Sequence, residues 1–185
     1  MPPVEAKRAR LKELVRAAVK TGPIKLASGK LSDFYFDGRL VTLSQEGAFL
    51  LSNLMLPVLL MHRIDSVGGL SIGADPIISS VGLMAYQKDI PMRMVYVRKA
   101  VKDHGTGKLV EGPAIPPNSR AAVVEDVVTS GASALQAAKA IRSAFDDVIV
   151  DTVLCLVDRE EGGREMLESE GLFLHAIFRK GELLK

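Results

Sequence analysis

The sequence has little of what several classes of protein require. It contains no tryptophan and one cysteine, Cys155, which lies in the apolar run 152–157. A single cysteine excludes a disulfide within the chain, and its apolar surroundings favour a small buried side chain over a catalytic thiol. Aromatic residues are only 5% of the chain, so aliphatic side chains must fill the core. The formal net charge of +2 is too small to indicate nucleic-acid or membrane binding by itself.

Long apolar runs are also missing. No stretch reaches the ~18 apolar residues that a membrane helix needs, and the most apolar segment, Leu50–Met61, contains Asn53 and Pro57. The N-terminus, Met1–Glu5, lacks the apolar core of a signal peptide. We therefore expect a cytoplasmic protein that does not contact a membrane. Its 185 residues, 48% hydrophobic and 25% charged, favour one globular domain.

Hydrophobic periodicity and turn residues predict that helices and strands alternate. Helices are expected at 5–20, 45–62, 75 to about 88, 132–144 and 161–170. Gly22-Pro23 should end the first helix, Ser44 should cap the second, and Asp75 should cap the third. Strands are expected at 34–36, 65–68, 92–97, 121–124, 148–157 and 172–178. The pattern favours an α/β fold with a mostly parallel central sheet flanked by helices, in which ligands bind at the carboxyl ends of strands.

The segment 99–118 shows no regular pattern and is rich in glycine and proline beyond its charged part. It is too long for a passive connection, which favours a mobile functional loop. A disordered surface insertion is the alternative.

The most informative segment is 123–133, in which an apolar strand ends in two acids, Glu125 and Asp126, before a turn of small and hydroxylated residues. A helix is expected directly after the turn. The backbone N–H groups of Thr129–Ser133 can then face an anion at a helix N-terminus. The two carboxylates can accept hydrogen bonds from sugar hydroxyls or hold Mg2+ through water. An N-capped helix without a ligand is the alternative.

This string resembles the motif with which type I phosphoribosyltransferases bind phosphoribosyl pyrophosphate (PRPP): an apolar strand, two acids, two apolar residues and a Thr-small-Gly-small-Ser/Thr turn. The resemblance implies that Glu125 and Asp126 bind the ribose hydroxyls, with Asp126 also a catalytic candidate, and that the turn holds the 5'-phosphate. The substrate-binding candidates in this segment are therefore Glu125, Val127, Val128, Thr129, Ser130, Gly131, Ala132 and Ser133. The first acid is often aspartate in the family.

The segment Arg98–Lys108 concentrates four lysine and arginine residues and one histidine. It resembles the flexible catalytic loop of orotate phosphoribosyltransferases, with the pattern Arg-Lys-x-x-Lys-x-His-Gly. Positive groups closed over a leaving pyrophosphate would stabilise its developing charge. The resemblance implies that Lys102 is the leading catalytic residue, assisted by Lys99 and His104, and that Arg98 binds substrate. It also implies a homodimer, because the loop of this family reaches the neighbouring subunit's site. A solvated basic loop is the alternative.

The segment 28–39 resembles the part of the same family that covers orotate, with the pattern Ser-Gly-x-x-Ser-x-x-Tyr/Phe-Phe. The resemblance implies that Tyr35 and Phe36 pack on the flat pyrimidine, although either could instead fill the core. Relatives often carry a lysine directly before the Ser-Gly pair, where this chain has Ala27. Lys25 or Lys30 is a candidate substitute.

Two further segments fit the same resemblance. Gly68–Pro76 is similar to the family's pyrophosphate loop, in which glycines let backbone N–H groups face a diphosphate. Many relatives have a lysine where this chain has Gly73, and a plain N-capped turn is the alternative. Arg159 matches the family's Asp-Arg pair, and the resemblance implies that it grips the carboxylate of orotate. The alternative is that Arg159 binds no substrate and forms a surface ion pair with Glu160 or Glu161.

On these motifs, which span about residues 22–164, the chain is identified as a member of the orotate phosphoribosyltransferases. The resemblance implies transfer of the 5-phosphoribosyl group from PRPP to orotate, giving orotidine 5'-monophosphate and pyrophosphate in pyrimidine biosynthesis, with Mg2+ as cofactor. No direct Mg2+ ligand is assigned, and Glu125 and Asp126 are candidates through water. We expect one domain over 1–185, with an N-terminal helix and hood at about 1–43 and a core at about 44–178. A purine phosphoribosyltransferase and a PRPP-sensing regulator are the rival interpretations.

Overall fold

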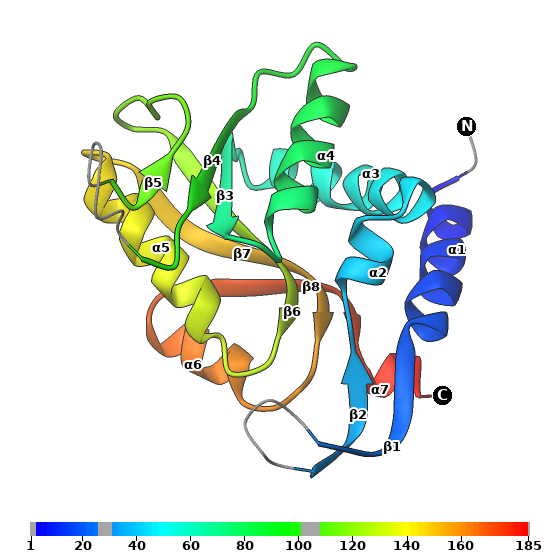
Figure 1. Ribbon diagram of the computed structural model, residues 1–185. Coiled ribbons are helices and arrows are strands. Elements are labelled where there is room, and N and C mark those ends of the chain that lie inside the picture. Colours follow the sequence, from blue (N-terminus) through cyan, green and yellow to red (C-terminus); the bar gives the residue numbers. More distant parts are fainter. Residues whose placement is uncertain (1–2, 26–30, 101–107, 185) are drawn as a thin grey trace.

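The computed structural model of the chain describes residues 3–25, 31–100 and 108–184. Its centre is a sheet with the strand order β5-β4-β3-β6-β7-β8 (Figure 1). The strands are β3 (Ser66–Leu70), β4 (Arg93–Val97), β5 (Val110–Glu111), β6 (Arg120–Val128), β7 (Ile149–Asp158) and β8 (Phe173–Arg179). Neighbouring strands are parallel except for the pair β4 and β5. The expectation of an α/β fold with a mostly parallel sheet is confirmed.

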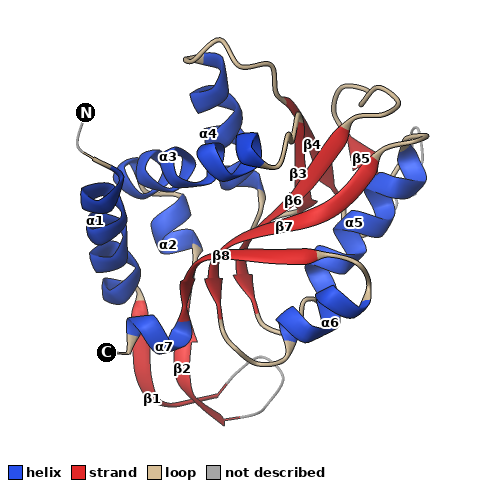
Figure 2. Ribbon diagram, turned by 180° about the vertical axis from the view of Figure 1, so that it is seen from behind, coloured by secondary structure: helices blue, strands red, loops and turns tan. Residues whose placement is uncertain are grey.

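Helices cover both faces of this sheet (Figures 1 and 2). One face is covered by α1 (Val4–Ala17), α3 (Gln45–Met61) and α4 (Asp75–Tyr86), and the other by α5 (Ala132–Ala144) and α6 (Gly163–Ser169). Successive side chains of a strand point to opposite faces. In β6, Ala122 and Val124 pack in the core beneath α3 and α4, whereas Ala121 and Val123 pack in the core beneath α5. A strand that is apolar on both faces is buried only between two layers.

Two short helices, α2 (Arg39–Thr42) and α7 (Lys180–Leu183), were not expected from the sequence. A helix of one turn is too short to show a hydrophobic period. Within the described ranges, no helix is both long and apolar enough to cross a bilayer.

Several local predictions can be compared with the structure. Ser44 caps α3 as predicted, since its Oγ accepts a backbone N–H hydrogen bond of 3.0 Å. Cys155 is a fully buried free cysteine, and burial raises the pKa of its thiol. Asp75 is not the cap of α4, because Ala74 occupies that position and Asp75 is the first helical residue. The Asp75 carboxylate instead accepts a hydrogen bond of 2.9 Å from Ser71 Oγ.

The prediction that Gly22-Pro23 ends the first helix was wrong. The helix α1 ends at Ala17, and the pair lies inside β1 (Val19–Lys25), which is antiparallel to β2 (Leu31–Phe36). The register of the two strands shifts between Thr21 and Ile24, and Gly22 has a φ of 112°. Glycine accepts this backbone, and proline has no N–H for the ladder, so the pair marks a strand irregularity.

The segment 99–118 is not irregular throughout, because it contains β5. This short strand pairs with the end of β4, and the Arg98 backbone N–H donates to the Leu109 carbonyl oxygen at 2.8 Å. The two ends of the intervening segment are therefore joined at the edge of the sheet.

The central strand β6 is longer than predicted. It continues through Glu125 and Asp126 to Val128, and Val127 is still paired with Val157 of β7. Acidic residues have weak strand preferences, but pairing with a buried neighbouring strand outweighs them.

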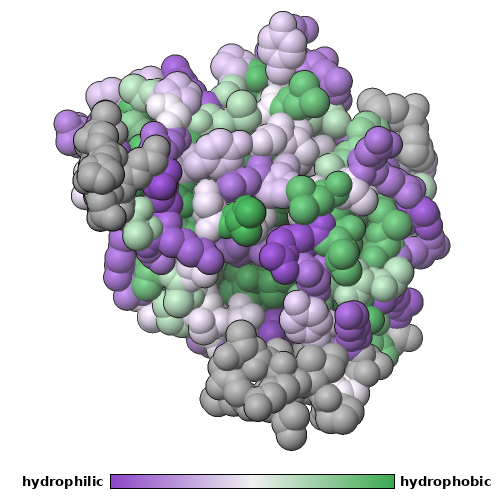
Figure 3. Space-filling view, viewed as in Figure 1, coloured by the Kyte–Doolittle hydropathy of each residue, from purple (hydrophilic) through white to green (hydrophobic). Residues whose placement is uncertain are grey.

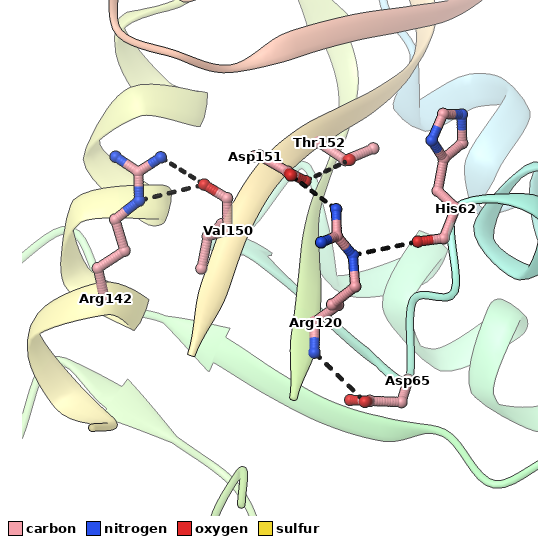
Figure 4. Close-up of polar contacts among 7 residues, drawn as sticks. All are labelled: His62, Asp65, Arg120, Arg142, Val150, Asp151 and Thr152. Carbon is pink, nitrogen blue, oxygen red and sulfur yellow. Dashed lines mark hydrogen bonds and ion pairs between the residues drawn. The ribbon is translucent and has the colours of Figure 1, made fainter. Parts of the chain in front are cut away.

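Arg120, the first residue of β6, fixes the amino-terminal end of the sheet (Figure 4). Its Nη2 donates to Asp151 Oδ2 at 2.6 Å, and its Nε donates to the His62 carbonyl oxygen at 3.2 Å. The backbone N–H of Arg120 donates to Asp65 Oδ2 at 3.3 Å. One residue thus connects β6 to β7 and to the chain that follows α3.

The register of β6 and β7 shifts at this end, between Arg120 and Ala122. The irregular part of β7 is held from α5, because both Nε and Nη2 of Arg142 donate to the Val150 carbonyl oxygen (Figure 4). Asp151 also accepts a hydrogen bond of 2.8 Å from Thr152 Oγ1. These contacts satisfy polar groups that the shifted ladder would otherwise leave unpaired.

Replacement of Arg120 by alanine should lower the free energy of unfolding by about 1–3 kcal/mol, because charge-assisted hydrogen bonds are lost. Partial burial raises the pKa of Asp151, but hydrogen bonds from Thr152 and Arg120 outweigh it and hold that pKa below its ordinary value. The contribution of the pair should be complete above about pH 4 and should fade as the pH falls through the pKa of Asp151.

Urea unfolding at about pH 7 and about pH 3 measures both effects. Arg63→Ala removes an exposed arginine and is the control. Equal losses in the two variants at neutral pH would contradict the role given to Arg120.

Candidate active site

Glu125 and Asp126 lie in the last part of β6, where the strand is still paired with β7, at the edge formed by the carboxyl ends of the parallel strands. Figure 1 shows this end of β6. Alternation along the strand turns Glu125 toward the α5 layer and Asp126 toward the opposite layer. Glu125 is 6% exposed, and Asp126 is partly buried. Asp126 Oδ1 also accepts a hydrogen bond of 2.8 Å from the Val127 N–H. The two acids therefore reach the site from opposite faces of one strand.

The turn after β6 forms a small cup. A cavity of about 100 Å3 is lined by Glu125, Val127 and the residues Val128–Ala134. Gly131, directly before α5, has a φ of 78°, and the first N–H groups of a helix have no partner within it. These N–H groups and the helix dipole favour an anion. All the residues predicted to hold a phosphate, Thr129–Ser133, line this one cavity, together with the substrate-binding candidates Val127 and Val128.

Two glycines allow α6 to pack directly against the cup. A Cβ on Gly163 would lie 2.5 Å from the Thr129 carbonyl oxygen, and a Cβ on Gly131 would lie 2.6 Å from a methionine of α6. The backbone N–H of Arg159 donates to the Val128 carbonyl oxygen at 2.9 Å. The cup is therefore held by the segment between β7 and α6 as well as by α5.

A second pocket, of about 230 Å3, shares Glu125, Val127 and Ser133 with the cup. It is lined further by Asp126, by Arg39 of α2, by Leu70–Gly73 after β3 and by Lys99 after β4. Gly73 comes close to both acids, since a Cβ there would lie 2.8 Å from Asp126 Oδ1 and 3.1 Å from Glu125 Oε1. Figure 3 shows this side of the molecule, where hydrophilic and hydrophobic side chains meet. Together the two cavities form one cleft along the end of β6.

Burial controls the charge of the two acids. Burial, followed by the charge of Asp126, raises the pKa of Glu125 to about 8, and the positive charge of Lys99 opposes this shift. Burial also raises the pKa of Asp126. Glu125 Oε2 is buried and has no hydrogen-bond partner among the described residues. A ligand that brings hydroxyl donors or a cation can displace the proton of such a group.

Arg159 lies directly after β7, beside the strand that carries the acids. Its side chain is 10% exposed, and its Nη2 lies 3.0 Å from Glu161 Oε1, so the ion pair considered as an alternative is present. Asp158 fixes this turn by accepting hydrogen bonds from the Glu160 N–H at 2.9 Å and from Arg164 Nη2 at 3.1 Å. Sequence reasoning gave Asp158 no role of its own, although it immediately precedes Arg159.

The two aromatic candidates, Tyr35 and Phe36, are neighbours on β2 and therefore point to opposite sides. Phe36 is 6% exposed and belongs to the core beneath α1 and α3, which supports the core alternative for this residue. Tyr35 is partly exposed. It stays a candidate for base contact. Ala27 lies outside the described residues.

The structure describes two of the four basic-loop candidates. Lys99 lines the second pocket with the acids, as a catalytic role would require. Arg98 instead lies with its Nη1 3.8 Å from Glu111 Oε1. Lys102 and His104 lie outside the described residues.

Sequence reasoning assigned the segment 28–39 to the cover over orotate but gave no role to its last residues, Asp37, Gly38 and Arg39, which lie beside the cleft at the start of α2. Arg39 lines the second pocket and pairs with Asp37. Gly38 approaches the acids closely, because a Cβ there would lie 2.7 Å from Asp126 Cβ. The available signal was a charged Asp-Gly-Arg string directly after the aromatic segment, but its meeting with β6 depends on tertiary packing.

The buried Glu125 should make the protein less stable as the pH rises. Its pKa is raised from 4.5 to about 8, so between these values the folded state binds more protons than the unfolded state. The free energy of unfolding then falls with rising pH, by up to about 1.4 kcal/mol per pH unit from this group. Replacement of Glu125 by glutamine should remove that part of the slope.

Chemical unfolding at intervals between about pH 5 and about pH 8 measures the two slopes. Glu165→Gln, at an exposed position of α6, is the control. Parallel curves for wild type and Glu125→Gln would show that Glu125 ionises in its ordinary range.

Comparison with known proteins identifies relatives, although no protein-family model matches the chain. The chain is 42% identical over 170 residues to the orotate phosphoribosyltransferase of Synechocystis sp., covering 92% of this chain and 84% of that protein. It is 43% identical over 160 residues to the orotate phosphoribosyltransferase of Aquifex aeolicus, covering 86% of each. The crystal structure of the Mycobacterium tuberculosis H37Rv orotate phosphoribosyltransferase in complex with PRPP matches with a TM-score of 0.79 at 32% identity, covering 97% of this chain and 99% of that one. The chain therefore belongs to the orotate phosphoribosyltransferase family.

Proposed function

We propose that this chain transfers the 5-phosphoribosyl group of PRPP to orotate, giving orotidine 5'-monophosphate and pyrophosphate. The observation that carries the proposal is the junction of β6 and α5, where an anion cup lies directly beside two acids. A sugar phosphate needs both features, because its phosphate takes hydrogen-bond donors and its hydroxyls take acceptors. The M. tuberculosis relative was solved with PRPP bound, which supports the same substrate here.

The cup and the acids would bind two neighbouring parts of PRPP, one of which needs hydrogen-bond donors and the other acceptors. The 5'-phosphate would occupy the cavity at the start of α5, where Thr129, Ser130 and Ser133 add hydroxyl donors. The ribose hydroxyls would donate to Glu125 and Asp126. Positive charge develops on the sugar as the bond to pyrophosphate breaks, and a fixed carboxylate beside the sugar stabilises that charge. We assign this stabilisation of the sugar's positive charge to the Asp126 carboxylate.

The leaving pyrophosphate would be held in the second pocket. In its backbone wall, Leu70–Gly73, the Ser71 N–H donates to the Val97 carbonyl oxygen, and the N–H groups of Ile72 and Gly73 can face phosphate oxygens. Lys99 brings a positive charge to the same space. Lys102, His104 and Arg98 complete this proposed set, with Lys102 and His104 outside the described residues. Cations closed over the pyrophosphate act most strongly once water is excluded.

Orotate would be placed by Arg159, whose planar guanidinium pairs a carboxylate through two parallel hydrogen bonds. The backbone hydrogen bond from the Arg159 N–H to the Val128 carbonyl oxygen fixes the backbone of Arg159 beside the turn that forms the cup. Tyr35 is the aromatic candidate for contact with the pyrimidine. The ring nitrogen N1 of orotate can react as an anion, so little general-base catalysis is needed.

The residues present fit Mg2+ as the cofactor. Glu125 and Asp126 offer carboxylate oxygens, the ligands that Mg2+ prefers, and Glu125 Oε2 has no described hydrogen-bond partner. No group of three or more His, Cys, Asp or Glu that could hold a metal occurs in the described part of the chain. That suits an ion held by one or two carboxylates, here through water, together with substrate phosphates. Mg2+ bound there would neutralise charge on the pyrophosphate.

A homodimer with shared sites is part of the proposal, because the catalytic loop of this family reaches the neighbouring subunit. Large apolar side chains are exposed on and directly after α2, after β3 and on α4: Leu40, Leu43, Ile72, Leu83 and Tyr86. Of these, Ile72 lines the second pocket. Figure 3 shows apolar side chains gathered over α2. Gathered exposed apolar residues usually mark an interface, which supports contact with a second copy here. The cytoplasmic location stays a prediction.

The direct test follows the ultraviolet absorbance of orotate in the presence of PRPP and Mg2+. Adenine, uracil and hypoxanthine are offered in parallel assays. Turnover of orotate in preference to the other bases is expected. A chain that used a purine faster than orotate, or that used none of the bases, would not be an orotate phosphoribosyltransferase.

Replacement of Arg159 by alanine should raise the KM for orotate by about tenfold to a hundredfold, because a bidentate charged contact is lost. The KM for PRPP should stay within about twofold, since Arg159 does not line the phosphate cavities. Glu161→Gln is the matched control, because it removes the acid 3.0 Å from Arg159 and leaves the guanidinium in place. If only Glu161→Gln changed the orotate KM, the carboxylate contact would lie elsewhere.

A further inference from the structure

An arginine outside the predicted site residues faces the two acids across the second pocket. Arg39 is the first residue of α2, and its side chain is 51% exposed. It lines the pocket together with Lys99, Glu125 and Asp126, and the chain at Leu70–Gly73 forms a further wall. Arg39 and Lys99 are the cationic side chains that the described residues bring to this pocket, and they come from separate segments.

Arg39 is held in a defined orientation by Asp37. Its Nε donates to Asp37 Oδ1 at 2.9 Å, its Nη2 to Asp37 Oδ2 at 3.0 Å, and its backbone N–H to Asp37 Oδ1 at 3.1 Å. This paired geometry leaves Nη1 of the planar guanidinium to bind another anion. The hydrogen bonds from Arg39 also lower the pKa of Asp37, so the pair stays ionised at neutral pH. A side chain that is oriented before a ligand arrives loses less entropy on binding.

Gly38 ties this arginine to the strand that carries the acids. A Cβ on Gly38 would lie 2.7 Å from both Cβ and Oδ2 of Asp126. The backbone directly before Arg39 therefore contacts the Asp126 side chain. The backbone of Arg39 cannot shift relative to Asp126 unless the start of α2 moves with it.

We propose that Arg39 binds the diphosphate of PRPP, with Asp37 as its positioning residue. This inference rests on the proposed function, because the pocket must receive PRPP. If the 5'-phosphate occupies the cup and the ribose hydroxyls face the acids, the group on C1 of the ribose must enter the pocket that Arg39 lines. The diphosphate is the most highly charged part of the substrate, and the Nη1 side of the guanidinium, which Asp37 does not occupy, can donate to its oxygens.

The carboxylate of orotate is the other anion that Arg39 could meet. It is the weaker candidate, because the pocket of Arg39 is shared with the glycine-containing chain at Leu70–Gly73 and with Lys99. Both features suit phosphate oxygens. Arg159, the proposed partner of the carboxylate, lies beyond the cup at the end of β7.

The test uses Arg39→Gln, Arg39→Lys and Asp37→Asn in the full chain. Arg39→Gln should raise the KM for PRPP and the inhibition constant of pyrophosphate about tenfold or more, with the orotate KM within about twofold. Arg39→Lys keeps the charge but loses the fork, and should give an intermediate rise. Asp37→Asn should raise the KM for PRPP about threefold alone and not further in the Arg39→Gln background, because a positioning residue acts through its partner.

Arg10→Gln is the matched control. Arg10 is also an exposed arginine, at 48%, with its Nε 2.7 Å from Glu46 Oε1, and it lines neither cavity of the cleft. Arg10→Gln should leave the KM for PRPP, the inhibition constant of pyrophosphate and the KM for orotate unchanged. An unchanged KM for PRPP in Arg39→Gln, or a rise in the orotate KM in its place, would overturn the inference.

These outcomes are distinct from a failure of the proposed function. A wild-type chain that formed no orotidine 5'-monophosphate would fail before any variant was compared, and calorimetric binding of inorganic pyrophosphate to wild type and Arg39→Gln would still decide the role of Arg39. Circular dichroism shows whether Arg39→Gln is folded. If Arg39→Gln is not folded, the KM for PRPP and the inhibition constant of pyrophosphate are measured for Arg39→Lys instead. Unchanged values in Arg39→Lys would then overturn the inference.

Discussion

The pairing of β6 with β7 beyond the apolar core is the interaction on which the cleft depends. Past Val124 the ladder continues, with Glu125 opposite Cys155 and Val128 opposite Asp158. A strand that ended at its last apolar residue would leave both acids in a loop. Because the ladder holds them, one acid is fixed on each face, and the chain reaches the start of α5 in a defined direction.

The same arrangement explains why the acids are electrically unusual. Burial raises the pKa of both carboxyl groups, and the apolar core beneath α5 and the backbone at Gly38 are what bury them. Two cations, Lys99 and Arg39, stand across the pocket. The cleft thus brings two carboxyl groups and two cations together in a partly dehydrated space, where charge interactions are stronger than in water. A ligand that carries both hydroxyls and phosphates matches it, because hydroxyls donate to the carboxyl groups and phosphates pair with the cations.

What could be predicted from the sequence was local. The acids, the turn and the start of α5 lie within one short stretch, so their proximity follows from chain connectivity, and the residues predicted for the phosphate line one cavity. The parallel sheet followed from apolar strands that alternate with helices.

What could not be predicted depends on distant contacts. Nothing in the sequence shows that Gly38 meets Asp126 or that Arg39 shares a pocket with Lys99. Alternation along β2 sends Phe36 into the core, which a pattern of two adjacent aromatics cannot reveal. Gly22-Pro23 predicts a helix stop when taken alone, and only the pairing of β1 with β2 on either side of it places it in a strand. The division into hood and core within one domain stays a prediction.

The hydrogen bond from the Arg98 N–H to the Leu109 carbonyl oxygen has an evolutionary consequence. It joins both ends of the basic segment at the sheet edge, so the placement of Lys99 is set by the strands β4 and β5 and not by the residues in between. The entropy of closing a chain segment grows only logarithmically with length, by about 0.6 kcal/mol for each doubling. Insertions and deletions that spare Lys102 and His104 can therefore accumulate between lineages without displacing Lys99 from the acids it faces.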